Sequence, residues 1–186
     1  KDQKDIVVKD QKDIVLKKLK PLLEDPSIKK IGQNIKFDFI VLYKHGINIS
    51  SMEDTMLMSY VLDAGKNRHN MDVLSEIHLN HKTITFKDIV GSGKKEINFS
   101  EVDIEKAKDY AAEDADITFR LYKKFNKNLK DEKMVNIYEV FEKPMIKILA
   151  FMEIEGIKVD NKFLETLSSK FEKKIEKIQK EVFKIS

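Results

Sequence analysis

The sequence predicts a helix-rich α/β fold whose few strands lie near the start of the chain. Most segments carry apolar residues at spacings of three and four, which is typical of amphipathic helices. The short segment Ile28–Ile31 stands directly before a Gly-Gln-Asn loop and is expected to form a buried strand. With 186 residues, of which 41% are hydrophobic, the chain can form one full domain and part of another.

The first half of the chain alternates helices and loops. We expect a helix over 14–24, because Pro26 disfavours helical backbone in the residue before it. After the strand, a second helix contains Phe37 and ends at Gly46. Asp54 and Asn70 are placed to cap the two helices that follow them.

The middle of the chain begins with a loop of extended character over 83–86, which continues to Gly93. Ser100–Asp103 resembles a capping box, and the helix after it should run to about Leu129. A further helix over 134–155 ends before Gly156.

The last part of the chain is a short extended segment and one helix. The segment 157–160 is expected to be extended, and Asn161 is expected to cap the helix after it. Seven apolar residues recur along this helix at spacings of three and four, as in a coiled-coil seam. They are Leu164, Leu167, Phe171, Ile175, Ile178, Val182 and Ile185.

We place three segments along the chain. Residues 1–15 contain Lys-Asp-Gln-Lys-Asp-Ile-Val twice and give no indication of function. Residues 16–130 form the first domain, and residues 131–186 begin a second one, because the stretch Lys130–Lys133 is the only polar break that could mark a boundary.

Composition excludes several classes of protein. The 35 basic and 32 acidic residues leave a net charge of +3, so charge alone gives little indication of nucleic-acid binding. The absence of cysteine excludes disulfides and thiolate metal sites. No apolar run approaches the roughly 20 residues that span a bilayer, and the charged start has no signal-peptide core. We therefore expect a cytoplasmic protein that does not contact membranes.

Two groups of residues indicate metal-assisted chemistry. Tyr110 and Asp114 stand four residues apart in a helix-forming run, so both can face one pocket. Asp38 follows Gln33 and Asn34 at a predicted strand-to-helix junction. Two-metal hydrolysis of a phosphodiester needs several carboxylates and a group that orients the attacking water.

These motifs, taken in order, resemble the 3′→5′ proofreading exonuclease domain of bacterial DNA polymerase I, a family A polymerase. The resemblance lies in Gly32–Asp38, Asp54–Leu57, His81–Phe86 and Tyr110–Asp116. It continues through Phe141–Met145 and Glu155–Asp160, which are similar to the start of the polymerase domain. It implies a partial ribonuclease-H-like fold, of the type that carries four acidic residues, followed by a helical thumb segment.

The resemblance also implies roles for individual residues. Asp38 and Asp114 would be metal ligands, and Tyr110 would help to orient the nucleophilic water. Two divalent ions, Mg²⁺ or Mn²⁺, would complete the site, and the partner would be the single-stranded 3′ end of DNA. Gln33 and Asn34 would contact the terminal nucleotides. Phe86 would stack on a base, since every base has a π-face, and Arg68 would lie near the path of the strand.

The sequence departs from the family pattern at its first motif. That motif, Asp-x-Glu, should lie about thirty residues before Lys1 in the family's spacing, and none occurs between Lys1 and Asp38. Asp103-Ile104-Glu105 has the right letters but lies after Asp38 in a polar helix start. Two carboxylates and three strands of the family's sheet are therefore not present. We expect these residues alone to have little exonuclease activity and no polymerase activity.

Other interpretations stay open. Asp38 could be a first-turn acid favoured by the helix dipole, Tyr110 and Phe86 could be core residues, and Arg68 could be a solvated loop charge. The whole unit could be a non-catalytic module that holds single-stranded DNA or supports a polymerase. The parent protein is expected to be monomeric, and the last helix is expected either to self-associate or to form half of an antiparallel thumb pair.

Overall fold

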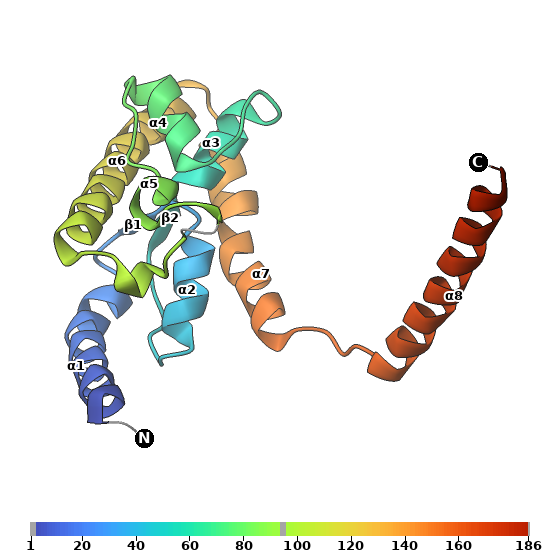
Figure 1. The fold of residues 1–186 in the computed structure, drawn as a ribbon. Helices are drawn as coiled ribbons and strands as arrows, with labels where there is room; N and C mark the ends of the chain where they lie inside the picture. The colour runs from blue at the N-terminus through green and yellow to red at the C-terminus, as the bar shows by residue number, and fades with distance from the viewer. Residues whose placement is uncertain (1–2, 94–95, 186) are drawn as a thin grey trace. The chain divides into compact units, whose positions relative to one another are not determined.

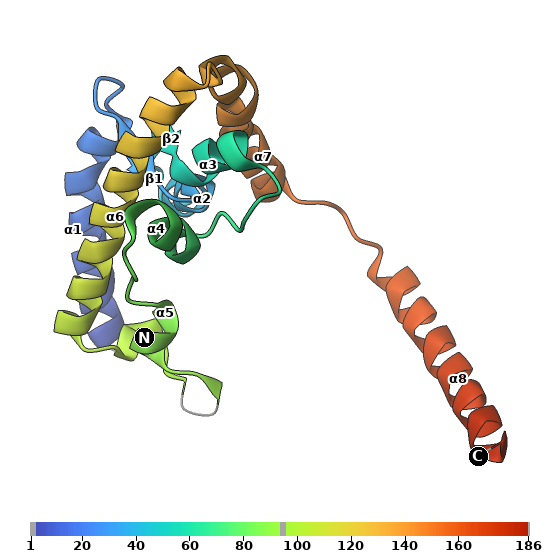
Figure 2. The ribbon, with the colours of Figure 1, turned by 90° about the horizontal axis from the view of Figure 1, so that it is seen from above.

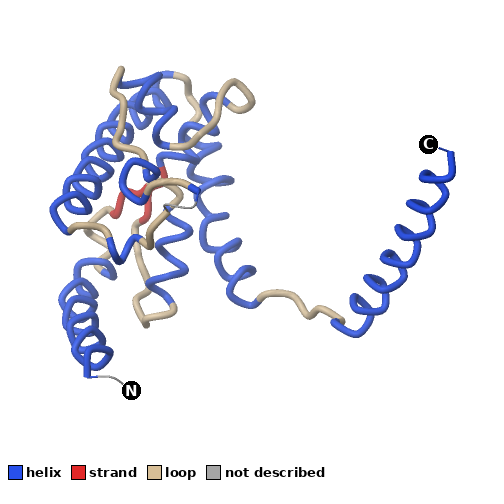
Figure 3. Tube along the Cα trace, viewed as in Figure 1, coloured by secondary structure: helices blue, strands red, loops and turns tan. Residues whose placement is uncertain are grey.

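The computed structural model describes residues 3–93 and 96–185, with side chains from Lys12 to Lys184 outside that gap. The chain divides into two compact units, Lys1–Ile154 and Glu155–Ser186. In the first unit, two short strands lie among helices, as Figures 1 and 3 show. Residues 1 and 2 of the duplicated N-terminal segment lie outside the described residues.

The elements follow one another along the chain with short connections. The first unit contains α1 (Gln3–Glu24), β1 (Lys30–Gly32), α2 (Ile35–Tyr43), β2 (Met52–Asp54), α3 (Thr55–Asp63), α4 (Met71–Leu79), α5 (Phe86–Val90), η2 (Phe99–Glu101), α6 (Ile104–Asp131), η3 (Ile137–Glu142) and α7 (Lys143–Glu155). The second unit contains α8 (Asn161–Ile185). No helix in the described ranges is long and apolar enough to cross a membrane.

The two strands pair in parallel, with Lys30 opposite Met52 and Gly32 opposite Asp54. Because α2 connects them, they form a β-α-β unit, and the α/β class predicted from sequence is confirmed. The strand expected at Ile28–Ile31 instead covers Lys30–Gly32, and it is only partly buried. The fully buried strand β2 was not predicted, because its three residues are Met-Glu-Asp rather than a run of β-branched residues.

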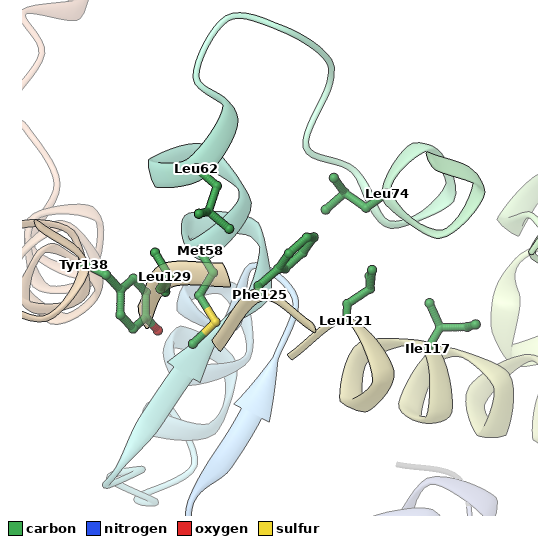
Figure 4. Packing of buried hydrophobic residues seen from close by; sticks show 8 residues of the cluster. All are labelled: Met58, Leu62, Leu74, Ile117, Leu121, Phe125, Leu129 and Tyr138. Atoms are coloured by element: carbon green, nitrogen blue, oxygen red, sulfur yellow. The ribbon is translucent and has the colours of Figure 1, made fainter. Parts of the chain in front are cut away.

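The larger hydrophobic core lies between α3, α4, α6 and η3. Figure 4 shows its eight side chains converging from these elements. From α6, four residues enter this core, and they recur at every fourth position, which places them on one face of the helix. The eight residues are Met58, Leu62, Leu74, Ile117, Leu121, Phe125, Leu129 and Tyr138.

A second core joins α2 and β2 to α7. Ile35 and Phe39 pack with Ile146 and Ala150, which are 2% and 0% exposed. The compact unit therefore extends to Ile154, past the boundary that we predicted between residues 130 and 131. The packing of α7 shows which residues share a core in this chain. It does not test where one functional domain ends and the next begins, so that boundary stays a prediction.

Several helix ends differ from the sequence predictions. Asp54 caps α3 as predicted, accepting a hydrogen bond from the Met56 N–H at 2.9 Å. Asn70 precedes α4 without a side-chain cap, so that prediction is correct only in position. Asp103 rather than Ser100 caps α6, because Ser100 lies inside η2. Asp160 rather than Asn161 caps α8, since its carboxylate accepts from the Phe163 N–H at 3.0 Å.

The second unit consists mainly of α8. Its predicted apolar stripe lies along one helix, and five of its members are about half exposed within the described residues. These are Leu164, Phe171, Ile175, Ile178 and Val182. The helix therefore forms where the sequence predicts it, and its stripe is available to a partner.

Candidate active site

Asp38 is positioned by a tight turn between β1 and α2. Gly32 ends the strand in a place where a Cβ atom would lie 2.9 Å from the Ile35 side chain. Asn34 then takes a left-handed conformation, with φ 58° and ψ 47°, and α2 begins at Ile35. Asp38 lies in the first turn of this helix, and partial enclosure raises the pKa of its carboxyl group.

Tyr110 and Asp114 lie one turn apart near the start of α6. Both side chains are half-buried. Burial and the adjacent Asp114 carboxylate raise the pKa of the Tyr110 phenol to about 12, so the phenol is neutral near pH 7. Burial also raises the pKa of Asp114, and the negative charges of Glu113 and Asp72 add to that effect. The phenol and the carboxylate therefore influence one another directly.

The two carboxylates predicted from separate motifs line the same cleft. This cleft has a volume of about 580 Å³, and both Asp38 and Asp114 lie in its wall. The views in Figures 1 and 2 agree that β1 lies between α6 and α2, which carry these residues. Sequence reasoning missed Lys29, the basic residue in the same wall, because nothing in its local pattern distinguishes it from the many other lysines.

Lys29 is held by two groups beside the cleft. Its ammonium group donates to the Tyr122 hydroxyl at 3.3 Å and lies 3.4 Å from the Glu53 carboxylate. The hydrogen bond to Tyr122 and the charge of Glu53 raise the pKa of Lys29. A positive charge therefore lies among the residues that line the cleft with the two candidate ligands.

The loop before Phe86 is attached to α6 next to Asp114. Glu113 accepts a hydrogen bond from the Ile84 N–H at 2.6 Å, and its other carboxylate oxygen lies 2.7 Å from the His81 ring nitrogen. Thr83 donates to Asp72 at 2.7 Å. The loop expected over 83–86 is therefore anchored, and its end, Phe86, begins the short helix α5, which was not predicted.

Phe86 belongs to an aromatic cluster rather than to the core. Its ring is 50% exposed and stacks on Phe99, with centroids 5.9 Å apart. Tyr110 lies edge-on to both rings, at 6.4 Å and 6.3 Å. The cluster therefore connects the predicted base-stacking residue to the predicted catalytic phenol. Phe99, which lies 13 residues after Phe86, was not predicted as part of the site.

The remaining predicted contact residues lie in different surroundings. Gln33 lines the cleft, while its amide group donates to the His69 carbonyl at 2.7 Å. Asn34 is exposed at the turn before α2. Arg68 is exposed on the loop between α3 and α4, and it is not among the residues that line the cleft.

The carboxylates fit a divalent metal only in part. Carboxylate oxygens are the ligands that Mg²⁺ and Mn²⁺ prefer, and Asp38 and Asp114 could each supply one or two. Within residues 3–93 and 96–185, however, no three acidic or histidine side chains converge as a metal site. Any metal bound in this cleft therefore needs further ligands from water, DNA or other residues.

The fold and the cleft define a small α/β domain whose candidate site contains two carboxylates, the kind of group that holds the metal ions in metal-assisted hydrolysis of phosphate esters. The family model for the 3′-5′ exonuclease domain of DNA polymerase A matches residues 3–130. The chain therefore belongs to the 3′-5′ exonuclease family of DNA polymerase A, as the motifs predicted.

Curated relatives agree with this assignment. DNA polymerase I of Rhizobium leguminosarum is 45% identical over 166 residues, covering 89% of this chain and 16% of the relative. DNA polymerase I of Pseudomonas aeruginosa is 38% identical over 172 residues, covering 90% of this chain and 19% of the relative. The chain thus spans less than a fifth of the length of either relative.

A solved structure supports the same fold. It is the polymerase domain of Pol1 from M. smegmatis in complex with a DNA primer-template and dNTP. The TM-score is 0.67 at 22% identity, over 86% of this chain and 24% of that chain. At this identity the likeness concerns the fold alone.

Proposed function

We propose that this chain contributes to the 3′→5′ exonuclease site of a DNA polymerase, which removes mismatched nucleotides from the 3′ end of a primer in the cytoplasm. The observation that carries the proposal is the shared cleft: Asp38 from α2 and Asp114 from α6 both line it, and Tyr110 lies one turn from Asp114. Membership in the exonuclease family supports the reaction type.

Asp38 and Asp114 would serve as ligands of a divalent metal, Mg²⁺ or Mn²⁺, with two ions in the complete site. When bound, such ions supply an activated water and stabilise the leaving oxygen. The remaining carboxylate ligands would come from residues that this sequence does not contain.

The residues of this chain would bind and orient the DNA end. Tyr110 keeps its proton near pH 7, so its hydroxyl can hold a water by hydrogen bonding beside Asp114. Phe86, backed by Phe99, offers a half-exposed ring to a terminal base. Stacking of this kind is worth about 1–3 kcal/mol per base and does not depend on sequence. Lys29 places a positive charge in the wall of the cleft, where a phosphate would lie.

The contacts of Gln33, Asn34 and Arg68 with DNA follow from the family pattern. Gln33 lines the cleft and Asn34 is exposed at its edge, so both could reach a terminal nucleotide. Arg68 lies on a separate loop, and its contact would be with nucleotides farther from the 3′ end.

The first prediction concerns the candidate ligands in the full-length protein. Asp38→Asn and Asp114→Asn should each nearly abolish trimming of a mismatched 3′ end, while primer extension stays unchanged. Tyr110→Phe should cost less, on the order of 10²-fold, because orienting groups are typically worth about 10²–10⁴-fold. The measurement is release of the terminal nucleotide from 3′-labelled DNA with Mg²⁺ and with Mn²⁺.

Asp116→Asn provides a matched control. Asp116 lies on α6, as Asp114 does, but it is exposed and pairs with Arg120 at 3.4 Å. Loss of its charge should therefore leave trimming unchanged. Unimpaired trimming by Asp38→Asn or Asp114→Asn would overturn the assignment. DNA binding without any trimming by the full-length protein would indicate the non-catalytic module instead.

A further inference from the structure

Asp54 holds the turn that carries the candidate site residues. Its side chain is 1% exposed and lies at the end of β2, opposite Gly32 of β1. One carboxylate oxygen accepts from the Asn34 N–H at 3.0 Å, and the other accepts from the Ile35 N–H at 3.0 Å. The first oxygen also accepts from the Met56 N–H, which caps α3. One buried carboxylate thus joins the starts of two helices.

The turn needs such support because its backbone conformation is unfavourable. Asn34 has φ 58°, a left-handed conformation that is uncommon outside glycine, although asparagine adopts it more readily than most residues. The first N–H groups of a helix also have no partner within the helix. Both carboxylate oxygens of Asp54 meet these needs at once. Beside it, the Thr55 hydroxyl donates to the Gly32 carbonyl at 3.1 Å and fixes the other side of the turn.

This backbone turn also sets the positions of residues that face the cleft. Gln33 lies within it, and Asp38 follows four residues after Asn34, one helical turn along α2. A rotation of the first turn of α2 would therefore move the Asp38 carboxylate relative to Asp114 on α6. The carboxylate of Asp54 is itself bonded to backbone N–H groups and points away from solvent.

We propose that Asp54 is a positioning residue for the exonuclease site: it acts by fixing the Gln33–Ile35 turn, and through that turn it sets the place of Asp38. This inference rests on the proposed function for the identity of the reaction. The claim that Asp54 holds the Gln33–Ile35 turn does not depend on that function. It goes beyond the helix cap that the sequence predicts, because capping α3 uses only the bond to Met56.

The variant Asp54→Ser separates the two roles. Serine is as good a helix cap as aspartate, so it can keep the bond to Met56, but its single short hydroxyl cannot bond both Asn34 and Ile35. In the full-length protein we expect the amides of Asn34 and Ile35 to exchange hydrogen at least tenfold faster, while the amides of Leu121 and Phe125 stay protected. We expect kcat for trimming to fall at least tenfold with primer extension unchanged.

A second variant controls for a general loss of stability. Leu129→Ala opens a cavity in the larger core at the far end of α6, roughly 22 Å from Asp114 along the helix. At a temperature where both variants are equally far below their melting points, Leu129→Ala should keep trimming within about twofold of the unchanged protein.

Three outcomes would overturn the proposal: normal exchange at Asn34 and Ile35 in Asp54→Ser, trimming within twofold of the unchanged protein, or an equal loss in Leu129→Ala. If the unchanged protein itself does not trim DNA, the proposed function fails, while the exchange experiment still decides whether Asp54 holds the turn.

Discussion

At the scale of single residues, Tyr138 connects the sheet to the segment after α6. Its hydroxyl donates to Glu53 Oε2 at 3.0 Å and accepts from the Asp54 N–H at 3.0 Å. Lys143 reaches the other oxygen of Glu53 at 2.9 Å. Glu53 is 3% exposed, so these bonds compensate the cost of burying its charge. Burial raises the pKa of the Tyr138 hydroxyl well above its ordinary value, so the group stays neutral.

The prediction at this scale is that Tyr138→Phe lowers the free energy of unfolding by about 1–3 kcal/mol. The ring would still fill the core, but one carboxylate oxygen of Glu53 and the Asp54 N–H would be buried without a partner, which costs about that much. Denaturant titration measures the loss. Tyr60→Phe is the control. Tyr60 is 47% exposed, so loss of its hydroxyl should change the free energy of unfolding little. Equal stability of the two variants would contradict the role of Tyr138.

At the scale of elements, α6 performs two tasks with different parts of its length. Ile117, Leu121, Phe125 and Leu129 anchor its later turns in the larger core. Tyr110 and Asp114 lie on the earlier turns, where the helix borders the cleft. The buried turns fix the direction of the helix, and the site residues therefore have defined positions although they are only half-buried.

The helix α8 carries an apolar stripe, five of whose described members are about half exposed. We expect the 186-residue chain to self-associate through it as its concentration rises, because exposed apolar surface of this kind usually finds a partner. Light scattering over a concentration range measures the mass. The double variant Leu167→Glu, Phe171→Glu should remain monomeric, whereas Lys170→Gln, on an exposed position of the same helix, should associate normally. A constant monomer mass for the unchanged chain would show that the stripe has no such partner.

At the scale of the whole molecule, the compact unit and the match to the exonuclease family end at different residues. The family match ends at residue 130, whereas the compact unit continues to Ile154. The reason is that Tyr138 completes the larger core and that Ile146 and Ala150 of α7 complete the second one.

A fragment that ends at Lys130 should therefore be much less stable than one that ends at Glu155. Removal of Tyr138 alone takes away a large buried ring, and losses of that kind cost about 3–5 kcal/mol. We expect the free energy of unfolding to fall by at least about that amount, measured by thermal and denaturant unfolding of the two fragments. Equal stability would mean that η3 and α7 contribute little to the first unit.

The sequence alone determined the family and most helices, and it predicted the residues of the candidate site. Tyr110 and Asp114 could be paired from spacing, because the period of an α-helix places residues four apart on one face. The family match confirms the motifs as those of an exonuclease domain. The roles of Asp38, Tyr110, Asp114, Gln33, Asn34, Phe86 and Arg68 stay predictions, to be tested by the variants above.

Only the tertiary structure decided which distant groups meet. Nothing local indicates that Asp54 bonds the Asn34 turn, that Phe99 backs Phe86, or that Tyr138 reaches Glu53 from 85 positions away. The short strand β2 and the helix α5 were also missed, since three or five residues carry too little periodicity to identify. Local patterns encode the elements through backbone preference, whereas contacts between elements depend on how their buried faces pack.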